Sequence, residues 1–239
     1  VQGAPQVAES VARPELYQKN NVEGPRVLLE ALRTSGKACP VVFSSTCAVY
    51  GIPESLPMHE QLGLKPISPY GQSKLDCEGL LAQYSQDCAM PTLALRYFNA
   101  CGADPGADIG EDHEPESHLI PILIQAAMQG RAMKIFGNDF PTADGTCVRD
   151  YIHVLDLADA HLAGANFLQS QRDRDEASFR ALNLGTGCGY SNLEILQAVE
   201  RVGECKIDWE YGPRRDGDPP SLVANAEAAE AALGFKPKY

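Results

Sequence analysis

Long hydrophobic runs and an excess of positive charge are both missing from this chain of 239 residues. The longest strongly apolar stretch, residues 118–128, is interrupted by Pro121 and is too short to cross a bilayer, so no membrane partner is expected. Lys and Arg together number 20 against 32 Asp and Glu, and no basic run occurs. Nucleic-acid binding is therefore not expected either.

The chain also lacks cysteine pairs at C-x-x-C spacing and a recognisable secretion signal. Its eight cysteines are scattered, which argues against a structural zinc centre, and no metal site is predicted. Scattered free thiols are typical of a reducing compartment, so we expect a cytoplasmic protein. The first residues contain no basic segment followed by an apolar core, so a secretory signal peptide is not expected.

The composition itself is that of an ordinary globular protein, with 44% hydrophobic and 22% charged residues. A short apolar run at 41–43, followed by polar residues at 44–46, is typical of a buried parallel strand whose carboxyl end opens into a polar site. A Ser-Pro helix start predicts a helix at about 70–85, and the next strand is predicted at 92–98. This alternation indicates an α/β fold with a parallel sheet.

The other segments extend the same alternation. A helix is predicted over 20–35, with Val22, Val27 and Leu28 on one face. Residues 102–116 are rich in Gly, Pro, Asp and Glu, which indicates a domain boundary or an active-site loop. Further helices are predicted at 119–129, 154–168, 193–202 and 226–233, and further strands at 133–136, 180–184 and 206–211.

Tyr70 and Lys74 stand four residues apart on a predicted helix, so both side chains face the same side. A nearby ammonium group favours the phenolate, and lowering the pKa of a Tyr by about three units corresponds to roughly 4 kcal/mol. Such a Tyr could take a proton from a substrate hydroxyl at neutral pH. An exposed helix pair has the same spacing, but the polar strand end at 44–46 favours the catalytic interpretation, because ligands bind outside the carboxyl ends of parallel strands.

Five longer motifs carry a resemblance to a known family. They read FSSTCAVYG at 43–51, SPYGQSK at 68–74, LRYFNACGADP at 95–105, IFGNDFPTADGTCVRDYIHVLDLADAH at 135–161 and PRRDGDPP at 213–220. With these motifs the chain resembles the UDP-glucose 4-epimerases of the extended short-chain dehydrogenase/reductase superfamily, from about Val7 onwards. The resemblance implies an α/β fold with a doubly wound parallel sheet of the Rossmann type, N-terminally truncated, and a smaller mixed substrate-binding domain.

The same resemblance implies the domain division and the reaction. Residues 1–102 are expected to be the remaining part of an NAD-binding domain, and 103–239 mainly a substrate-binding domain, with segments at about 145–190 returning to the sheet. Members of the family hold NAD tightly and interconvert UDP-glucose and UDP-galactose. A Tyr phenolate removes the proton from the sugar O4 while C4 gives a hydride to NAD+, and the 4-keto sugar then rotates and takes the hydride back.

Residue roles follow position by position. By resemblance, Tyr70 is the catalytic base and acid, Lys74 lowers its pKa and holds the nicotinamide ribose, and Thr46 is the hydroxyl partner. Thr46 could instead be a strand-end cap, and Phe98 could simply pack in the core. The implied NAD contacts are Asn21, Ser44, Tyr70, Lys74 and Phe98.

A UDP-sugar substrate also needs groups that bind its diphosphate. Arg149 and Arg215 match the family's phosphate-binding arginines, whose planar forks bind phosphate oxygens with two hydrogen bonds. The plain alternative is a surface ion pair, for example between Arg149 and Asp150. The other implied substrate contacts are Thr46, Asn99, His118, Leu119, Lys134, Ile135, Phe136, Asp218 and Leu222.

Several alternatives stay open. Leu222 lies where the family varies its sugar pocket, so a UDP-N-acetylhexosamine, UDP-pentose or UDP-uronate 4-epimerase is an alternative to the UDP-glucose enzyme. A dehydratase is disfavoured because Cys47 and Ala48 stand where such enzymes usually have Asp and Glu. The family begins with a G-x-x-G-x-x-G turn that this sequence does not contain. The family also continues beyond the position of residues 236–239. We therefore expect a fragment that lacks the N-terminal glycine-rich turn and the C-terminal end, for which an inactive remnant is a further alternative. A homodimer formed through the helices at 20–35 and 70–85 is also implied.

Overall fold

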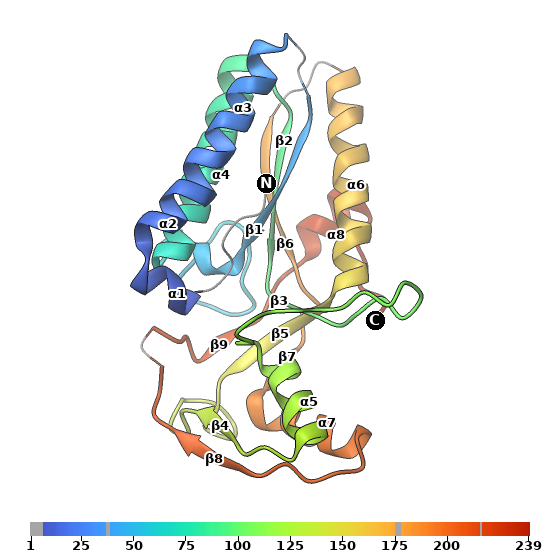
Figure 1. The fold of residues 1–239 in the computed structure, drawn as a ribbon. Coiled ribbons are helices and arrows are strands. Elements are labelled where there is room, and N and C mark those ends of the chain that lie inside the picture. The colour runs from blue at the N-terminus through green and yellow to red at the C-terminus, as the bar shows by residue number, and fades with distance from the viewer. Residues whose placement is uncertain (1–6, 37–38, 175–177, 216) are drawn as a thin grey trace.

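The computed structural model describes residues 7–36, 39–174, 178–215 and 217–239, so residues 1–6 of the first predicted domain lie outside the described residues. Two parts are stacked along the long axis of the molecule (Figure 1). The upper part, here called the sheet part, contains a parallel sheet flanked by helices. The lower part, here called the small part, contains shorter strands and two helices.

The centre of the sheet part consists of β1 (Val41–Thr46), β2 (Thr92–Tyr97) and β6 (Phe179–Leu184). They run parallel in the order β1-β2-β6, with Thr46 opposite Tyr97 and Tyr97 opposite Leu184. All three carboxyl ends therefore meet at one edge, which faces the small part (Figure 1). The parallel sheet that the alternating pattern predicted is confirmed.

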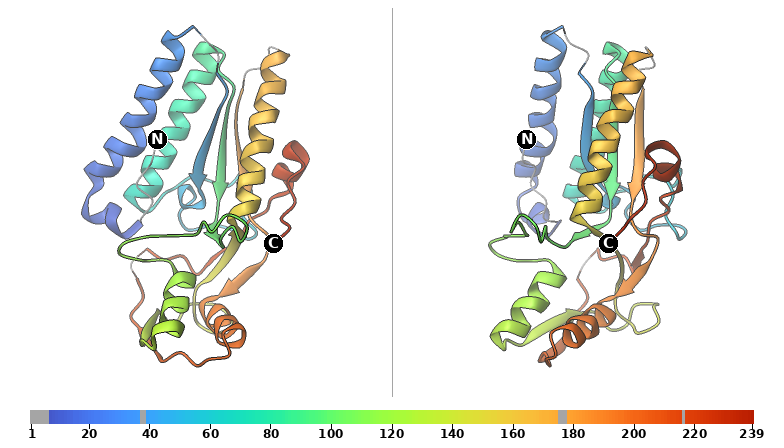
Figure 2. Two further views of the ribbon diagram at one scale, coloured as in Figure 1. Left: turned by 45° about the vertical axis from the view of Figure 1, so that its right-hand side comes forward. Right: turned by 90° about the vertical axis from the view of Figure 1, so that its right-hand side faces the viewer.

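Helices cover both faces of this sheet, as the views in Figure 2 show. On one face α3 (Gly24–Thr34) and α4 (Pro69–Cys88) lie side by side, and α6 (Val154–Asp173) and α8 (Glu227–Leu233) cover the other. Each face encloses its own apolar core. The first core contains Val22, Leu29, Leu80, Leu81 and Met90, and the second contains Leu93, Leu95, Leu157, Leu168, Leu182 and Leu184.

The predicted helix over 20–35 is one stretch of a longer helical run. It follows α1 (Val7–Ala12) and α2 (Pro14–Gln18), begins with the π-helical turn η1 (Lys19–Glu23) and continues into α3. The predicted face is only partly correct. Val22 is buried, but Val27 and Leu28 are 69% and 43% exposed, and Leu29 is buried in their place. Leu29 lies seven residues after Val22, which is two helical turns, so the regular helical period places Leu29, and not Val27 or Leu28, on the face of Val22.

The small part contains two sheets. β5 (Val148–His153) is the central strand of the first, pairing with β3 (Asn99–Cys101), β7 (Gly189–Ser191) and β9 (Ser221–Leu222). The second pairs β4 (Met133–Phe136) with β8 (Trp209–Gly212). The helices α5 (Leu119–Gln129) and α7 (Asn192–Val202) pack around Leu123, Leu196 and Ile207. The strands β3, β5, β7 and β9 were not predicted, because most contain two or three residues and alternate weakly.

The segment 102–118 joins β3 to α5 and has no helix or strand of its own beyond an isolated bridge between Asp104 and Ile109. It crosses the boundary between the two parts (Figure 1). The helix α8 packs beside α6 and β6, so it belongs to the sheet part, although the predicted domain division left it with the substrate-binding residues. Within the described ranges, no helix has both the length and the apolar character that crossing a bilayer demands.

Candidate functional site

Thr46 and Tyr70 meet at the carboxyl end of β1. Thr46 is the last residue of β1 and is buried, and its Oγ1 accepts a hydrogen bond from the Ala48 backbone N–H at 3.2 Å. It therefore caps the short 3-10 turn η2 (Cys47–Val49), as the plain alternative expected. The Thr46 side chain also acts on the Tyr70 phenol, whose pKa it lowers, so the hydroxyl serves both purposes.

The start of α4 positions Tyr70. Ser68 adopts an extended backbone, its Oγ accepts from the Gly71 N–H at 3.1 Å, and Pro69 occupies the first helical position. A Ser cap followed by proline fixes where a helix begins. Gly71 is needed here, because a Cβ on it would come within 2.6 Å of the Ala48 carbonyl oxygen. The turn that carries Tyr70 can therefore approach the end of β1 closely.

Lys74 lies one turn further along α4 and reaches back to β1. Its Nζ donates to the Ser44 carbonyl at 2.9 Å and lies 4.8 Å from the Phe43 ring centroid and 5.9 Å from the Tyr70 ring centroid. The hydrogen bond and the aromatic face hold the ammonium group beside the tyrosine. The predicted proximity of Tyr70 and Lys74 on one helix face is present.

The pKa of Tyr70 differs from the expectation. Burial raises the pKa of Tyr70 above the ordinary value, the neighbouring Tyr97 adds to this, and the Thr46 hydroxyl opposes it. Burial also lowers the pKa of Lys74 itself. In the chain alone, removal from water therefore outweighs the attraction that Lys74 was expected to exert, because a phenolate loses more by desolvation than a cation at this distance returns.

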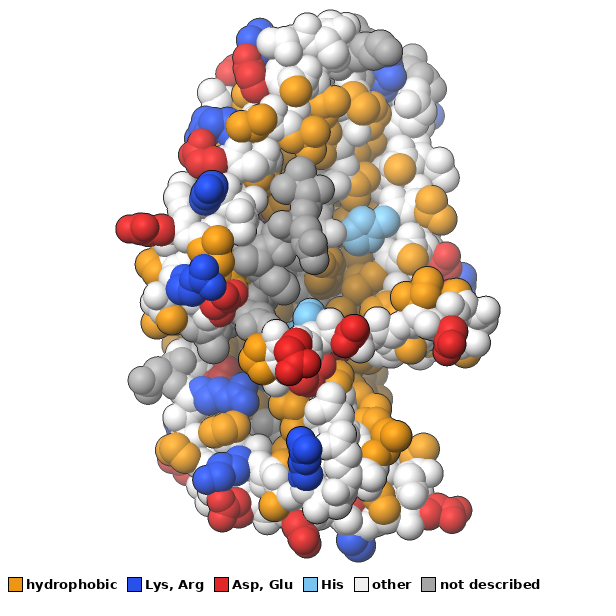
Figure 3. Space-filling model, in the orientation of Figure 1, with side chains coloured by type: hydrophobic (Ala, Val, Ile, Leu, Met, Phe, Trp, Pro, Cys, Tyr) orange, Lys and Arg blue, Asp and Glu red, His pale blue; other side chains and the backbone are white. Residues whose placement is uncertain are grey.

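A cavity of about 310 Å³ opens between β1, α3 and α4 beside this pair. In Figure 3 hydrophobic side chains gather in the hollow of the sheet part. Asn21 lies in its wall and is buried, and its Nδ2 donates to Ser73 Oγ at 3.0 Å, while Ser73 Oγ donates to the Tyr70 carbonyl at 2.8 Å. The polar lining comes from Asn20, Asn21, Ser44, Tyr70, Lys74 and Tyr97.

Ser44 also lines this cavity, but its hydroxyl is engaged with α6. Ser44 Oγ lies 3.0 Å from His161 Nε2, and His161 Nδ1 lies 2.7 Å from the Leu157 carbonyl. A carbonyl only accepts, so Nδ1 carries the ring proton in the neutral histidine, and Nε2 accepts from Ser44. The predicted contact of Ser44 with NAD would therefore use the Ser44 backbone, or require the Ser44 hydroxyl to rotate away from His161.

Phe98 and Leu222 lie elsewhere, in one buried cluster. Phe98 is 6% and Leu222 9% exposed, and both pack with Cys47, Tyr50 and Met58. Neither residue lines the cavity beside Tyr70 and Lys74. The structure thus places Phe98 in the apolar core, and its contact with a nicotinamide ring stays a prediction. The shared cluster puts Leu222 next to the turn that follows Thr46.

Arg149, on β5, binds the chain around β9. Its Nη1 donates to the Val148 and Pro219 carbonyls, both at 2.9 Å, and its Nη2 lies 3.5 Å from Asp218. The alternative pairing of Arg149 with Asp150 is wrong. Asp150 points the other way and accepts from the backbone of Thr186, Gly187 and Ala224 at 2.8 to 3.1 Å, because successive strand residues face opposite sides.

A second cluster of predicted substrate residues surrounds Phe136. The Arg215 guanidinium lies 4.2 Å from the centroid of its ring, and β8 approaches the other side closely enough that a Cβ on Gly212 would meet the ring at 3.0 Å. Lys134 instead pairs with Glu210 at 2.9 Å on an exposed face, and Ile135 is buried in the core. The side chains of Lys134 and Ile135 are thus occupied by these contacts. The nucleotide base of a UDP-sugar could contact the two residues only through their backbone.

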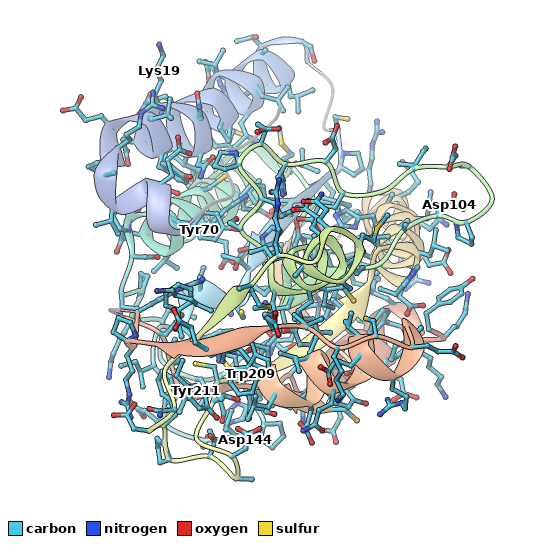
Figure 4. The ribbon with its side chains drawn as sticks, turned by 60° about the horizontal axis from the view of Figure 1, so that its bottom comes forward. Lys19, Tyr70, Asp104, Asp144, Trp209 and Tyr211 are labelled. Carbon is cyan, nitrogen blue, oxygen red and sulfur yellow. The ribbon has the colours of Figure 1, made fainter. Side chains whose placement is uncertain are left out.

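The remaining predicted contacts lie near the loop that crosses the boundary. Asn99 is the first residue of β3, opposite Tyr151. His118 immediately precedes α5, but its side chain does not cap the helix. The Nδ1 atom of His118 contacts Glu111 and is therefore not free for a substrate. Leu119 begins α5 and packs against the core of the small part. Tyr70 lies on the sheet part, whereas Trp209 and Tyr211 lie on the small part (Figure 4).

Sequence reasoning missed three aromatic residues around Tyr70. Tyr17 is buried edge-on against the Tyr70 ring, with centroids 6.3 Å apart and an interplanar angle of 88°. Phe43 lies beneath Lys74, and Tyr97 lines the cavity. The positions of Phe43 and Tyr97 in predicted strands next to polar strand ends were a usable signal. Tyr17 had none, because it precedes the helix that the pattern predicted.

A parallel sheet at whose carboxyl edge a strand hydroxyl meets a phenol and an ammonium group from a covering helix, beside a cavity, defines a nucleotide-binding enzyme of the Rossmann class. Within this class the chain belongs to the NAD dependent epimerase/dehydratase family, which residues 2–185 match. A UDP-glucose 4-epimerase from Rhizobium meliloti (strain 1021) is 47% identical over 235 residues, which cover 98% of this chain and 70% of that protein.

Solved structures agree with this assignment. A UDP-glucose 4-epimerase from Brucella ovis in complex with NAD superposes with a TM-score of 0.92 at 43% identity, covering 99% of this chain and 71% of that one. The enzyme from Stenotrophomonas maltophila, with bound NAD and formylated UDP-arabinopyranose, gives a TM-score of 0.92 at 38% identity, with 100% and 70% covered. The expected Rossmann-type α/β fold is confirmed.

Proposed function

We propose that this chain acts as an NAD-dependent UDP-glucose 4-epimerase, interconverting UDP-glucose and UDP-galactose through a 4-keto intermediate. The observation that carries the proposal is the convergence of Thr46, Tyr70 and Lys74 beside the cavity at the carboxyl end of β1. The relatives named above, which bind NAD and a UDP-sugar derivative, support the same reaction.

The cavity fits the nicotinamide end of the cofactor. Its lining offers an ammonium group, amides and hydroxyls for a ribose, and the ring of Tyr97 for a flat aromatic group. Asn21, Ser44, Tyr70 and Lys74 are the predicted cofactor residues that lie there. When bound, NAD supplies the hydride acceptor, and its oxidised ring is a cation that favours the phenolate.

The residues of this chain would handle the proton. Tyr70 Oη takes the proton from the sugar hydroxyl and returns it after the sugar has turned. The Thr46 hydroxyl and the nearby Lys74 ammonium both favour the ionised phenol. Burial opposes ionisation, so the phenolate would form only with these partners and the cofactor charge in place.

The UDP group would be held by the small part. The guanidinium groups of Arg149 and Arg215 are suited to a diphosphate, and Phe136 presents an aromatic ring at 4.2 Å from the Arg215 guanidinium. Asp218, which pairs with Arg149 at 3.5 Å, would accept from a ribose hydroxyl. This arrangement supports the predicted roles of these four residues.

We further propose that the protein works in galactose metabolism in the cytoplasm as a homodimer. Eight cysteines without disulfides among the described residues support a reducing compartment. The helices α3 and α4 lie side by side on one surface, and Val27 there is 69% exposed, which supports a helix-to-helix contact between two copies. Light scattering should give twice the mass of one chain, and the mass of one chain would contradict the dimer.

Replacing Tyr70 by Phe tests the reaction. In the NAD-loaded protein, Tyr70→Phe should lower turnover of UDP-galactose by about 100-fold or more, because only the proton-transferring oxygen is removed. Calorimetry should show unchanged UDP affinity. Tyr190→Phe is the matched control, since Tyr190 is 45% exposed on β7, and it should retain full turnover. Near-normal turnover of Tyr70→Phe, or an NAD-loaded protein that interconverts neither sugar, would overturn the proposal.

A further inference from the structure

The crossing segment 102–118 carries a cluster of metal-ligating side chains, of which only His118 is also an implied substrate contact. Its second half contains Glu111, His113, Glu116 and His118, a pattern of E-x-H-x-x-E-x-H. The lack of paired cysteines predicted no metal site, but this cluster contains histidine and glutamate ligands only. In Figure 3 acidic and histidine side chains lie together where the two parts meet, and Figure 4 shows Asp104 at the outer bend of the same segment.

One ligand atom from each of the four residues lies within 4.8 Å of all the others. His113 Nδ1 is 2.8 Å from Glu111 Oε1, and the Nδ1 atoms of His113 and His118 are each 3.8 Å from Glu116 Oε1. In a tetrahedral site with bonds of about 2.0–2.2 Å, neighbouring ligand atoms stand about 3.4 Å apart. Of the three distances given for the cluster, one is shorter and two are longer than 3.4 Å.

The orientation of His113 points to a ligand beyond the protein. Its Nδ1 is buried and has no hydrogen-bond partner, although Glu111 Oε1 is only 2.8 Å away. The two atoms are therefore within hydrogen-bonding distance of each other, but their orientation is not that of a hydrogen bond. Buried polar atoms are rarely left in this state, and an unplaced ion is one of the known explanations.

Glu116 holds its carboxylate in place before any ion binds. Only 7% of its side chain is exposed, and Oε1 accepts from the backbone N–H groups of Ser117 at 2.6 Å and His118 at 2.8 Å. Such hydrogen bonds fix the orientation of a ligating carboxylate. His118 is at once a ligand and the residue before α5, so an ion would tie the crossing segment to the start of that helix.

We propose that Glu111, His113, Glu116 and His118 bind one divalent transition-metal ion of the zinc class. Two imidazole nitrogens and two carboxylate oxygens suit Zn²⁺, whereas Ca²⁺ and Mg²⁺ prefer oxygen ligands alone. The two carboxylates can carry two negative charges, which a divalent ion would balance. Without an ion, the same groups could form only histidine–carboxylate pairs, which leave His113 Nδ1 unaligned.

Zinc titration of the metal-stripped chain tests the site. The protein is treated with chelator, dialysed at neutral pH and titrated with zinc chloride against a chromophoric zinc indicator. We expect one zinc ion per chain, a higher melting temperature with zinc, and a cobalt spectrum of a four-coordinate site without thiolate bands. His113→Ala should weaken zinc binding by at least about 100-fold. Glu111→Gln, which preserves shape, should weaken it as well and provides the test if His113→Ala folds poorly.

Two control variants separate this site from other ligands on the surface. His59→Ala removes a histidine whose Nδ1 contacts Gln61 at 2.9 Å, outside the cluster, and Cys188→Ser removes an exposed thiol. Both should bind zinc like the unchanged chain. Absence of zinc binding, binding that survives His113→Ala and Glu111→Gln, or binding lost in Cys188→Ser would overturn the proposal. The readout is metal binding, so it is independent of the epimerase activity.

Discussion

Leu222 shows how a side chain that is predicted to border the sugar pocket can belong to the apolar core. It follows the loop that carries Asp218, pairs across from Arg149, and packs on Cys47 and Phe98. Burial raises the pKa of the Cys47 thiol to about 12, and the Arg149 charge partly offsets this, so apolar and charged groups adjoin here. We propose that the size of residue 222 sets how much room a sugar has beside the turn that follows Thr46.

Leu222→Ser is expected to widen the sugar range. Removing the buried isobutyl group should raise the ratio of kcat/KM for UDP-N-acetylglucosamine to that for UDP-glucose by about tenfold, since a methylene-sized contact is worth about 1–3 kcal/mol. Turnover of both sugars by the NAD-loaded protein gives this ratio. Leu162→Ser, at a position 66% exposed on α6, should leave the ratio unchanged. A folded Leu222→Ser variant with the original ratio would remove this residue as the determinant of sugar size.

At the scale of elements, α4 joins catalysis to stability. Tyr70, Lys74 and Glu78 recur every four residues, so they form one stripe along the helix that faces β1. Glu78 is buried, accepts from Ser45 Oγ at 2.5 Å and forms a two-pronged pair with Arg96 on β2, at 3.0 and 2.6 Å. These contacts fix the position of α4 along β1 and β2, and thereby the position of Tyr70 relative to Thr46.

Glu78→Gln should destabilise the sheet part strongly. The Arg96 side chain, only 4% exposed, would keep its charge without a counter-charge, and breaking such a buried pair costs about 3–5 kcal/mol of unfolding free energy. Urea unfolding followed by circular dichroism measures the change. Glu30→Gln breaks a pair with Arg33 on the surface of α3 and should unfold at nearly the same urea concentration as the unchanged chain. Equal midpoints for the two variants would contradict this role of Glu78.

At the scale of the whole molecule, the proposed function divides the work between the two parts. The sheet part supplies Thr46, Tyr70 and Lys74 from the ends of its central strand and helix, and the small part supplies Arg149, Arg215 and Phe136. The crossing segment and β9 connect them. Substrate affinity and turnover should therefore respond to different substitutions.

Arg215→Met should weaken UDP binding by about tenfold or more while leaving retained NAD unchanged, because a charged hydrogen-bond donor is worth about 1.5–3 kcal/mol. Calorimetry with UDP and mass spectrometry of the nucleotide released on denaturation measure the two effects. Arg180→Met is the matched control, since Arg180 lies 5.3 Å from the Phe167 ring in the sheet part. Equal UDP affinity in all three proteins would contradict a diphosphate role for Arg215.

The sequence alone determined the features that depend on neighbouring residues. Ser68 and Pro69 located the start of α4, spacing of four placed Tyr70 and Lys74 on one face, and apolar runs located β1, β2, β4 and β6. The motifs indicated the family. Each of these features depends on residues that are close together in the sequence, because capping and periodicity act over a few residues.

Only the tertiary structure decided the rest, because it brings distant residues together. It turned Asp150 away from Arg149, committed Ser44 to His161 and placed Phe98 and Leu222 in one cluster. Burial, which no local pattern reports, raised the pKa of Tyr70 where the neighbouring charge had indicated the opposite. The cluster around Glu111 and His113 likewise exists only because a loop without regular structure folds back on itself.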